Sequence, residues 1–529
     1  MNQPPSQKPA SQDQDSASRD SASQEPVFAL LADPATHGGA EAKRIDTHAA
    51  SVFLAGSRAL KVKRAVRFPF LDYSTLERRR LACEAELEVN RNFAPQIYRR
   101  VLPITREPDG RLALGGDGTP VEWVVEMHRF DEHATLDRLA DTGKIDAELA
   151  DALGRIVAAA HARMTAIEPD AWIDALAEYI EEHVAAFRDA ADVFPLAAFD
   201  MLALRSRQEY ARIHPLLQER GQHGSIRHIH GDLHLGNIVM LDDRPVLFDA
   251  IEFNPLIASG DLLYDLAFLL MDLTERGLQG AANIVLNRYL VETARLEDID
   301  ALATLPFFLS IRAAIRAKVT AARLKQSPSE SRDAIARSAR HYFDFACRFI
   351  NPAPPMLLAV GGLSGTGKSM LARSLAPELA PAPGAVVLRS DVERKVLFGK
   401  SANDRLPEAA YAPEVTSRVY ATIADKARRA VAAGHSAIVD AVFARPDERA
   451  IMAQSAQALG VPFHGLFLVA DLDTRVARVG GRSRDASDAD AAVARNQEDY
   501  DLGTLDWVRV DASGTPEETF ARAMALLGK

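Results

Sequence analysis

The stretch from Gly362 to Ser369 constrains the fold of this chain more than any other. It reads G-L-S-G-T-G-K-S and fits the phosphate-binding pattern G-x-x-x-x-G-K-[ST] at every fixed position. In such a loop, glycines let backbone N–H groups close around phosphate oxygens, a lysine reaches the β- and γ-phosphates, and a hydroxyl ligates Mg²⁺. An apolar run at 356–360 precedes the loop and a helical pattern follows from residue 368. A buried parallel strand is therefore expected before the loop and a helix after it.

The eight residues of this loop are the expected nucleotide-binding set in this part of the chain. Lys368 is also expected to act on the transferring phosphoryl group, and Ser369 to bind Mg²⁺. The complete set is Gly362, Leu363, Ser364, Gly365, Thr366, Gly367, Lys368 and Ser369.

The chain has 529 residues, a length that suggests two to four domains. Residues 1–26 are rich in Ser, Gln, Asp, Ala and Pro and predict a disordered tail, because they carry almost no large apolar side chains. The prolines of residues 351–355 predict a linker. Two domains are therefore expected, at 27–350 and at 356–529.

The two expected domains differ in their pattern of secondary structure. Up to about residue 134 the first domain shows short β-type runs interrupted by one charged helical stretch, and beyond that point it is mostly helical. A β-rich lobe followed by a larger helical lobe is the layout of an α+β kinase-like fold. The second domain alternates strands and helices, which predicts a three-layer α/β P-loop domain with a parallel sheet. Its strands are expected at 356–360, 385–389, 436–440 and 464–469.

Composition argues against several classes of protein. The net charge of −11 argues against a general nucleic-acid binder. No apolar run approaches the roughly 20 residues needed to span a membrane. Cys83 and Cys347 offer neither a disulfide framework nor a metal-binding pair, which favours a reducing compartment, and the expected location is the cytoplasm.

A second pattern with chemical meaning runs from His230 to Asn237 as H-G-D-L-H-L-G-N, and Asp249 follows it. Phosphoryl transfer needs a carboxylate to accept the proton of the attacking hydroxyl, and oxygen ligands for Mg²⁺. Asp232, Asn237 and Asp249 supply these groups. Two other interpretations stay open, a loop that caps a helix and a zinc site. The ligands of that zinc site would be His228, His230 and His234.

This arrangement resembles the catalytic loop of the aminoglycoside and choline phosphotransferase family. The resemblance covers about residues 45–340 and is strongest at 228–270. It implies that Asp232 is the catalytic base and that Asn237 and Asp249 bind Mg²⁺, with Glu252 supporting a second metal site.

The same resemblance implies a lysine on the strand at 59–63, beneath the adenine and the phosphates of ATP. This favours Lys61, and Lys63 remains its rival because strand alternation places both on one face. The expected partner is Glu86, chosen by spacing from the three glutamates of the following helix. Met127 falls where the family's adenine-binding hinge would lie. The three glutamates are Glu84, Glu86 and Glu88.

Three further residues complete the expected P-loop site. Asp440 ends an apolar strand, where a second acid would hold Mg²⁺. Residues 356–525 resemble gluconate and shikimate kinases, and equally the zeta-toxin and polynucleotide-kinase branches. This resemblance implies that Asp391 contacts the acceptor hydroxyl, with Arg394 near it, and that Arg482 closes over the phosphate from a mobile lid. The other arginines of that lid would be Arg475, Arg478 and Arg484.

The whole architecture resembles bacterial fusions of an aminoglycoside phosphotransferase-like domain with a P-loop kinase. It implies a kinase with two sites for ATP and Mg²⁺ that phosphorylates hydroxyl groups of small metabolites, of sugar or sugar-acid type. Two alternatives stay open: a regulatory ATP-binding sensor that acts on a protein partner, and a zeta-toxin-like kinase of nucleotide sugars or nucleic acids. Neither a membrane nor, on charge grounds, a nucleic acid is the expected partner.

Overall fold

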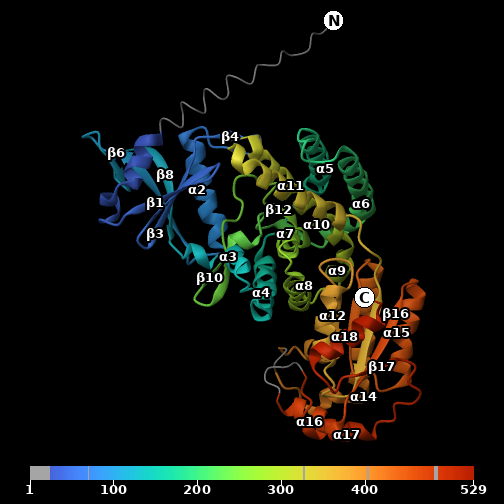
Figure 1. The fold of residues 1–529 in the computed structure, drawn as a ribbon. Coiled ribbons are helices and arrows are strands. Elements are labelled where there is room, and N and C mark those ends of the chain that lie inside the picture. The colour runs from blue at the N-terminus through green and yellow to red at the C-terminus, as the bar shows by residue number, and fades with distance from the viewer. Residues whose placement is uncertain (1–23, 69–70, 326–327, 402–403, 482–486, 529) are drawn as a thin grey trace. The chain divides into compact units, whose positions relative to one another are not determined.

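The computed structural model describes residues 24–528 except 69–70, 326–327, 402–403 and 482–486 (Figure 1). These residues form two compact units. The first comprises residues up to 145 together with 163–172 and 226–265, and the second comprises 146–162, 173–225 and 266 onward. The predicted tail falls mostly outside the described residues. Residues 24–32 are helical, so the predicted end of the tail at residue 26 lies inside this helix.

A six-stranded antiparallel sheet dominates the first unit, in the order β1-β2-β3-β8-β6-β7 (Figure 1). The α2 helix (Leu76–Arg91) packs against β8 and β6. Thr75 caps α2, because its side chain accepts a hydrogen bond from Arg78 N. The strands are β1 (Ala42–Asp46), β2 (Ala50–Ala55), β3 (Arg58–Lys63), β6 (Tyr98–Arg106), β7 (Leu112–Leu114) and β8 (Thr119–His128).

Short strands in the first unit carry the residues of the H-G-D pattern. The hairpin of β10 and β11 turns at Asp242 and Asp243, whose φ angles are 48° and 59°. Two consecutive residues with positive φ are typical of the two-residue turns that match strand twist. This hairpin places Asp249 shortly after Asn237. The elements are β9 (Ile226–His228), η3 (Leu235–Asn237), β10 (Ile238–Leu241), β11 (Arg244–Leu247) and β12 (Ser259–Asp261).

The remainder of the kinase-like domain is helical, as the sequence predicts. The α10 helix is buried on nearly all sides, and its Arg312 side chain lies over the Phe268 ring at 4.8 Å. Arg312 is therefore buried and does not belong to a solvated helix face. The helices are α3 (Leu136–Asp141), α4 (Ala147–Arg163), α5 (Asp170–Arg188), α6 (Leu196–Gln222), α7 (Leu262–Glu275), α8 (Gln279–Thr293), α9 (Leu296–Asp300), α10 (Leu305–Ala322) and α11 (Ser329–Phe349).

A five-stranded parallel sheet in the order β14-β15-β13-β16-β17 confirms the predicted P-loop fold. Its central strand β13 is buried along its whole length, because helices cover both faces of such a sheet. The strands are β13 (Leu357–Gly362), β14 (Val386–Arg389), β15 (Ala437–Asp440), β16 (Phe463–Val469) and β17 (Val508–Asp511), and the helices are α12 (Lys368–Leu375), α13 (Ser390–Leu397), α14 (Pro413–Ala432), α15 (Pro446–Leu459), α16 (Leu472–Gly480), α17 (Ala491–Asn496) and α18 (Pro516–Leu526).

The open edge of β14 is satisfied by a side chain rather than by another strand. Asn287 on α8 donates to Ala385 O at 3.1 Å and accepts from Val387 N at 2.6 Å. Its carboxamide therefore takes the place of one peptide unit of a neighbouring strand. Both partners belong to the same compact unit.

Within the described residues, none of the helices combines the length and the apolar composition that a membrane crossing requires.

Candidate active sites

Lys61 and Glu86 meet in the kinase-like site. The Lys61 ammonium lies 2.7 Å from Glu86 Oε1 and 2.6 Å from Asp249 Oδ1. Burial alone would lower the pKa of Lys61, but the carboxylates of Asp249 and Glu86 outweigh burial and raise that pKa well above its usual value. Lys61 is therefore a fixed positive charge next to the expected metal-binding residue.

Lys63, the rival lysine, occupies a different environment on the same strand face. Its ammonium lies 2.6 Å from Glu86 Oε2 and also contacts Glu252. Its side chain is only 3% exposed, against 15% for Lys61. Glu86 is thus the ion-pair partner of both lysines. Of the two lysines, Lys61 lines the adjacent cavity.

That cavity, of about 230 Å³, is mainly apolar and lies over the sheet of the first unit. Lys61 and Asp249 form its polar end. An apolar slot that ends in a charged pair suits a nucleotide, whose base is flat and whose phosphates are anionic. Its apolar lining includes Val52, Leu54, Ala59, Met127, Phe130 and Phe248.

The loop of the H-G-D pattern brings Asp232 and Asn237 together. Asn237 Nδ2 donates to the backbone oxygen and to Oδ2 of Asp232, each at 3.0 Å. This contact fixes the Asp232 carboxylate and turns the carboxamide oxygen of Asn237 away from it. Asp265, at the start of α7, braces the loop by accepting from His230 N and Gly231 N at 3.0 Å each.

Asp249 is held in an unusual backbone conformation. Its φ is 60°, a left-handed value that is costly for most non-glycine residues and is found where surrounding contacts enforce it. Tyr98 OH accepts from Asp249 N at 3.2 Å. The Asn90 carboxamide on α2 clamps the next residue, since it accepts from Ala250 N and donates to Ala250 O. The sequence analysis did not identify Tyr98 and Asn90 as residues of this site. No motif links either of them to Asp249 or Ala250, which lie about 150 residues further along the chain.

The oxygen donors of Asn237 and Asp249 fit Mg²⁺ by chemistry, since carboxylate and amide oxygens are its preferred protein ligands. The zinc alternative gains no support. His230 contacts Phe248 O, His234 accepts from Gly236 N, and no metal-holding group of three His, Cys, Asp or Glu side chains occurs in the described part of the chain.

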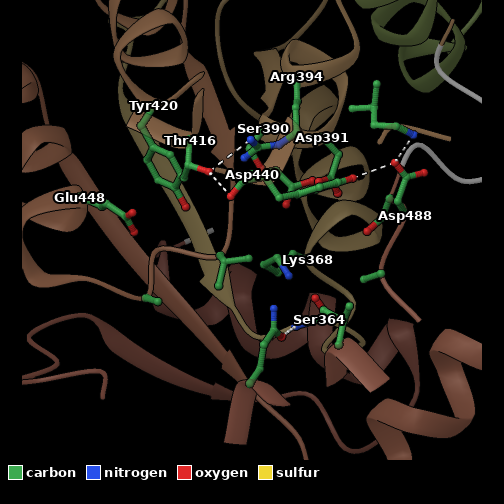
Figure 2. Close-up of a pocket in the computed structure, with 18 of the residues that line it drawn as sticks. Ser364, Lys368, Ser390, Asp391, Arg394, Thr416, Tyr420, Asp440, Glu448 and Asp488 are labelled. Atoms are coloured by element: carbon green, nitrogen blue, oxygen red, sulfur yellow. Dashed lines mark hydrogen bonds between the residues drawn. The ribbon is translucent and has the colours of Figure 1, made fainter. Parts of the chain in front are cut away.

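The P-loop site places Lys368, Ser369 and Asp440 around the end of β13 (Figure 2). Lys368 Nζ donates to Leu363 O at 3.1 Å, and Ser369 Oγ donates to Asp440 Oδ2 at 2.5 Å. Arg389 Nε lies 3.2 Å from the same Asp440 oxygen. The hydroxyl and carboxylate that were expected to bind Mg²⁺ are therefore in direct contact.

Glycine is required at Gly365 for two reasons. Its φ is 89°, and a Cβ there would lie 2.5 Å from the backbone oxygen of Arg475. A side chain at this position would clash with the backbone of α16, so the loop keeps its conformation only with glycine here.

A cavity of about 690 Å³ opens beside the loop (Figure 2). Asp391, from the first turn of α13, faces it together with Lys368 and Asp440. Burial, reinforced by the nearby Asp440 carboxylate, raises the pKa of Asp391. A carboxylate with a raised pKa next to a phosphate-binding lysine is suited to accept a proton from a hydroxyl.

The far side of this cavity is polar and aromatic. Arg394 is 6% exposed, donates to Ala410 O at 2.6 Å and to Thr416 Oγ1 at 3.2 Å, and lies over the Tyr411 ring at 4.9 Å. Its Nε has no partner although it is buried. A buried guanidinium with an unused donor beside a cavity is suited to bind an anionic or hydroxyl-rich ligand.

Asp488 closes the rim of the cavity, a contact that the sequence gave no reason to expect. Its carboxylate accepts from Tyr411 OH at 2.7 Å and from Leu406 N at 3.1 Å, and lies 3.2 Å from Lys395 Nζ. Asp488 thereby joins its own segment to α13 and to the segment that follows α13.

Two of the predicted lid arginines lie within the described residues, and both donate hydrogen bonds to backbone carbonyl groups of the P-loop domain. Arg475 is 1% exposed, and its guanidinium donates to Ser364 O at 3.0 Å and Ala494 O at 2.8 Å. Arg478 donates to Ala512 O and Gly514 O. The assignment of Arg475 to a lid is therefore wrong, since its side chain is buried beneath the loop. Arg478 is half-buried, and its guanidinium is bound to the backbone that follows β17. Arg482 and Arg484 lie outside the described residues.

Comparison with known proteins agrees with this architecture. The family described as Phosphotransferase enzyme family matches residues 57–302, and the family described as AAA domain matches residues 357–500. The fold, the sites and these matches define the chain as an ATP-dependent phosphotransferase, a kinase-like domain followed by a P-loop kinase domain.

The chain is 31% identical over 491 residues to two uncharacterized mycobacterial proteins, Rv2004c of Mycobacterium tuberculosis and Mb2027c of Mycobacterium bovis. The match covers 90% of this chain and 94% of each relative. The chain belongs to the same family as these proteins.

Solved structures similar to single domains include a gluconokinase from Sinorhizobium meliloti, at 20% identity and a TM-score of 0.24, which covers 33% of this chain and 92% of that one. A choline/ethanolamine kinase family protein from Mesorhizobium loti is 14% identical with a TM-score of 0.34, and covers 62% of this chain and 99% of that one. Both scores are low, and the family assignment does not depend on them.

Proposed function

We propose that the protein carries two sites for ATP and Mg²⁺ and transfers the γ-phosphoryl group to hydroxyl groups of small metabolites. The observation that carries this proposal is the cavity beside the P-loop, which Lys368, Asp391 and Arg394 line together. It combines a phosphate-binding lysine, a carboxylate with a raised pKa and a buried cation for the acceptor.

In the P-loop site, the backbone of the loop and Lys368 hold the β- and γ-phosphates, and Asp391 accepts the proton of the acceptor hydroxyl. Arg394 orients the acceptor. Mg²⁺, held by Ser369 and Asp440, supplies charge neutralisation at the phosphates when it is bound. Arg482 is proposed to close over the transferring phosphate.

In the kinase-like site, the Lys61 ammonium binds the phosphates of the nucleotide, and the Glu86 carboxylate holds the Lys61 side chain in position. Asp232 accepts the proton of the acceptor hydroxyl, and Met127 lies beside the base. Mg²⁺ held by Asn237 and Asp249 supplies the same neutralisation. The residues of this site differ from those of the P-loop site, so each is expected to work without the other.

A sugar or sugar acid is the acceptor class that we propose for the P-loop site. The cavity offers both hydrogen-bond acceptors and donors, which suits several hydroxyl groups, and its Arg394 guanidinium suits a carboxylate. The residues that face such a ligand include Asp391, Arg394, Thr416, Tyr420, Glu448 and Asp488.

The test is ATP consumption by the full chain against pooled metabolites, with the phosphorylated product identified by mass spectrometry. Pools of sugars and sugar acids should stimulate turnover. Asp391→Asn or Asp232→Asn should abolish the response to one class of pool each, while Asp200→Asn, an exposed aspartate on α6, should leave both unchanged.

Other outcomes would redirect the proposal. Stimulation only by nucleotide sugars or oligonucleotides would replace the sugar class with the zeta-toxin-like alternative. ATP binding without turnover under any pool, together with a co-purifying protein, would favour a regulatory sensor.

A further inference from the structure

Five charged side chains of the kinase-like site form one connected cluster in the first compact unit. Lys61 and Lys63 share Glu86, which gives one carboxylate oxygen to each ammonium. Each lysine also has a second acidic partner, which is Asp249 for Lys61 and Glu252 for Lys63. The cluster is therefore a chain of alternating charges that runs from Asp249 to Glu252.

The five charged side chains of this cluster differ in burial. The side chains of Lys63, Glu86 and Glu252 are 3%, 0% and 6% exposed, whereas Asp249 at the other end is 43% exposed. Two ammonium groups and three carboxylates leave one negative charge in excess. Because buried charges must be compensated, the two buried carboxylates balance the two lysines, and the excess charge falls to the exposed Asp249.

Glu252 is directed at Lys63 and not at the nucleotide cavity. Its Oε1 accepts from Tyr73 OH at 2.9 Å, and the Lys63 ammonium lies 5.3 Å from the centre of the Tyr73 ring. Tyr73 is 3% exposed, so this end of the cluster is closed off by an aromatic ring. Asp249 lines the nucleotide cavity and Glu252 does not.

We propose that Glu252 is a positioning residue that neutralises Lys63 and thereby leaves Asp249 to bind the Mg²⁺ that accompanies the nucleotide. Without Glu252, two lysines would face Glu86 alone, and Asp249 would be needed to compensate them. The Lys61 ammonium already lies 2.6 Å from Asp249 Oδ1, and the loss of Glu252 would strengthen this pairing, so that Mg²⁺ would compete less well for the Asp249 carboxylate. This inference rests on the proposed role of Asp249 as a metal ligand, and it differs from a role of Glu252 as a ligand itself.

The test measures binding of a non-hydrolysable ATP analogue by calorimetry over a series of Mg²⁺ concentrations. All variants are made in the full chain with Lys368→Ala, so that only the kinase-like site reports. Glu252→Gln should raise the Mg²⁺ concentration that gives half-maximal affinity by about tenfold, which corresponds to about 1.4 kcal/mol. Affinity measured without Mg²⁺ should stay the same or increase, because the site becomes more positive.

The decisive variant is Glu252→Gln combined with Lys63→Met, which removes both ends of the buried ion pair. Its Mg²⁺ requirement should return to within about twofold of the parent, because the charge balance of Lys61, Glu86 and Asp249 is restored. A double variant that stays as impaired as Glu252→Gln would overturn the proposal, since that result is expected if Glu252 itself binds the metal. Wild-type Mg²⁺ dependence in Glu252→Gln would overturn it as well.

Two further variants keep the test decisive. Tyr73→Phe removes one donor to Glu252 without changing charge, so it should shift the Mg²⁺ requirement in the same direction by a smaller factor, and it serves if Glu252→Gln does not fold. Asp249→Asn should abolish the Mg²⁺ dependence. If Asp249→Asn left that dependence intact, the proposed role of Asp249 would fail, and the inference about Glu252 would fail with it. If Asp249→Asn behaved as expected while Glu252→Gln matched the parent, the inference alone would fail.

Discussion

At the scale of single residues, Asp391 shows how the proposed chemistry conflicts with stability. Burial and the Asp440 carboxylate raise its pKa, so the folded protein binds this proton more tightly than the unfolded chain does. The ionised form that the proposed reaction needs is therefore disfavoured by folding. This group's contribution to stability is largest at acid pH and is lost as the pH rises through the raised pKa.

Asp391→Asn should separate the two effects. Product formation at the P-loop site should fall by about 10²–10⁴-fold, since a positioned general base contributes that much. The melting temperature at pH 7 should be equal to or above that of the wild type, because a buried carboxylate charge is removed. Scanning calorimetry and product assays check both. A large fall in melting temperature would mean that the ionised Asp391 supports the fold, contrary to its raised pKa.

Residues that share a motif with their partners were predictable from the sequence. Ser369 and Asp440 were both expected at one Mg²⁺ site, and the structure brings their side chains into contact. The contact of Asn237 with Asp232 was not predicted, although both residues belong to one short motif. Glu86 was chosen among three glutamates, and the structure pairs it with Lys61. The catalytic and binding roles themselves stay predictions.

At the scale of elements, the P-loop depends on a side chain from α16. Arg475 lies beneath the loop, with its guanidinium bound to Ser364 O, to Ala494 O and to the Glu498 carboxylate. The sequence could not separate this role from a lid or a solvated face, because four arginines at helical spacing fit all three. Only the fold of α17 against α16 shows which side is buried.

Arg475→Met should destabilise the protein by about 2–4 kcal/mol, because two carbonyl groups would be left without donors inside the domain. Nucleotide affinity at the P-loop site should fall in parallel. Denaturant unfolding and calorimetry measure the two quantities. Arg428→Met is the matched control, since Arg428 is 52% exposed on α14 and should cost less than about 0.5 kcal/mol. Equal effects of the two substitutions would contradict the anchoring role.

In the P-loop domain, the positions of strands with a continuous apolar sequence were predicted correctly. The edge strand of the sheet and the last helix of the chain were not predicted. The strands β13 to β16 were expected within a few residues of their bounds, because buried parallel strands are continuous apolar runs. The edge strand β17 and the final helix α18 were missed. β17 has a single buried residue, Val510, so its apolar signal is weak.

At the scale of the whole molecule, a kinase-like domain and a P-loop kinase domain occur in one chain. We propose that the first binds phosphate through Lys61 and the second through its P-loop and Lys368. Because the two sets of residues do not overlap, a substitution that abolishes nucleotide binding at one site should leave binding at the other site unchanged.

The most direct test is the number of Mg·ATP-analogue molecules bound per chain by the wild type and by Lys61→Ala, Lys368→Ala and the double variant. We expect two bound molecules for the wild type, one for each single variant and none for the double variant, with the affinity of the remaining site unchanged in each single variant. Isothermal titration gives these numbers directly. A wild type that binds one molecule, or a double variant that still binds, would contradict the account.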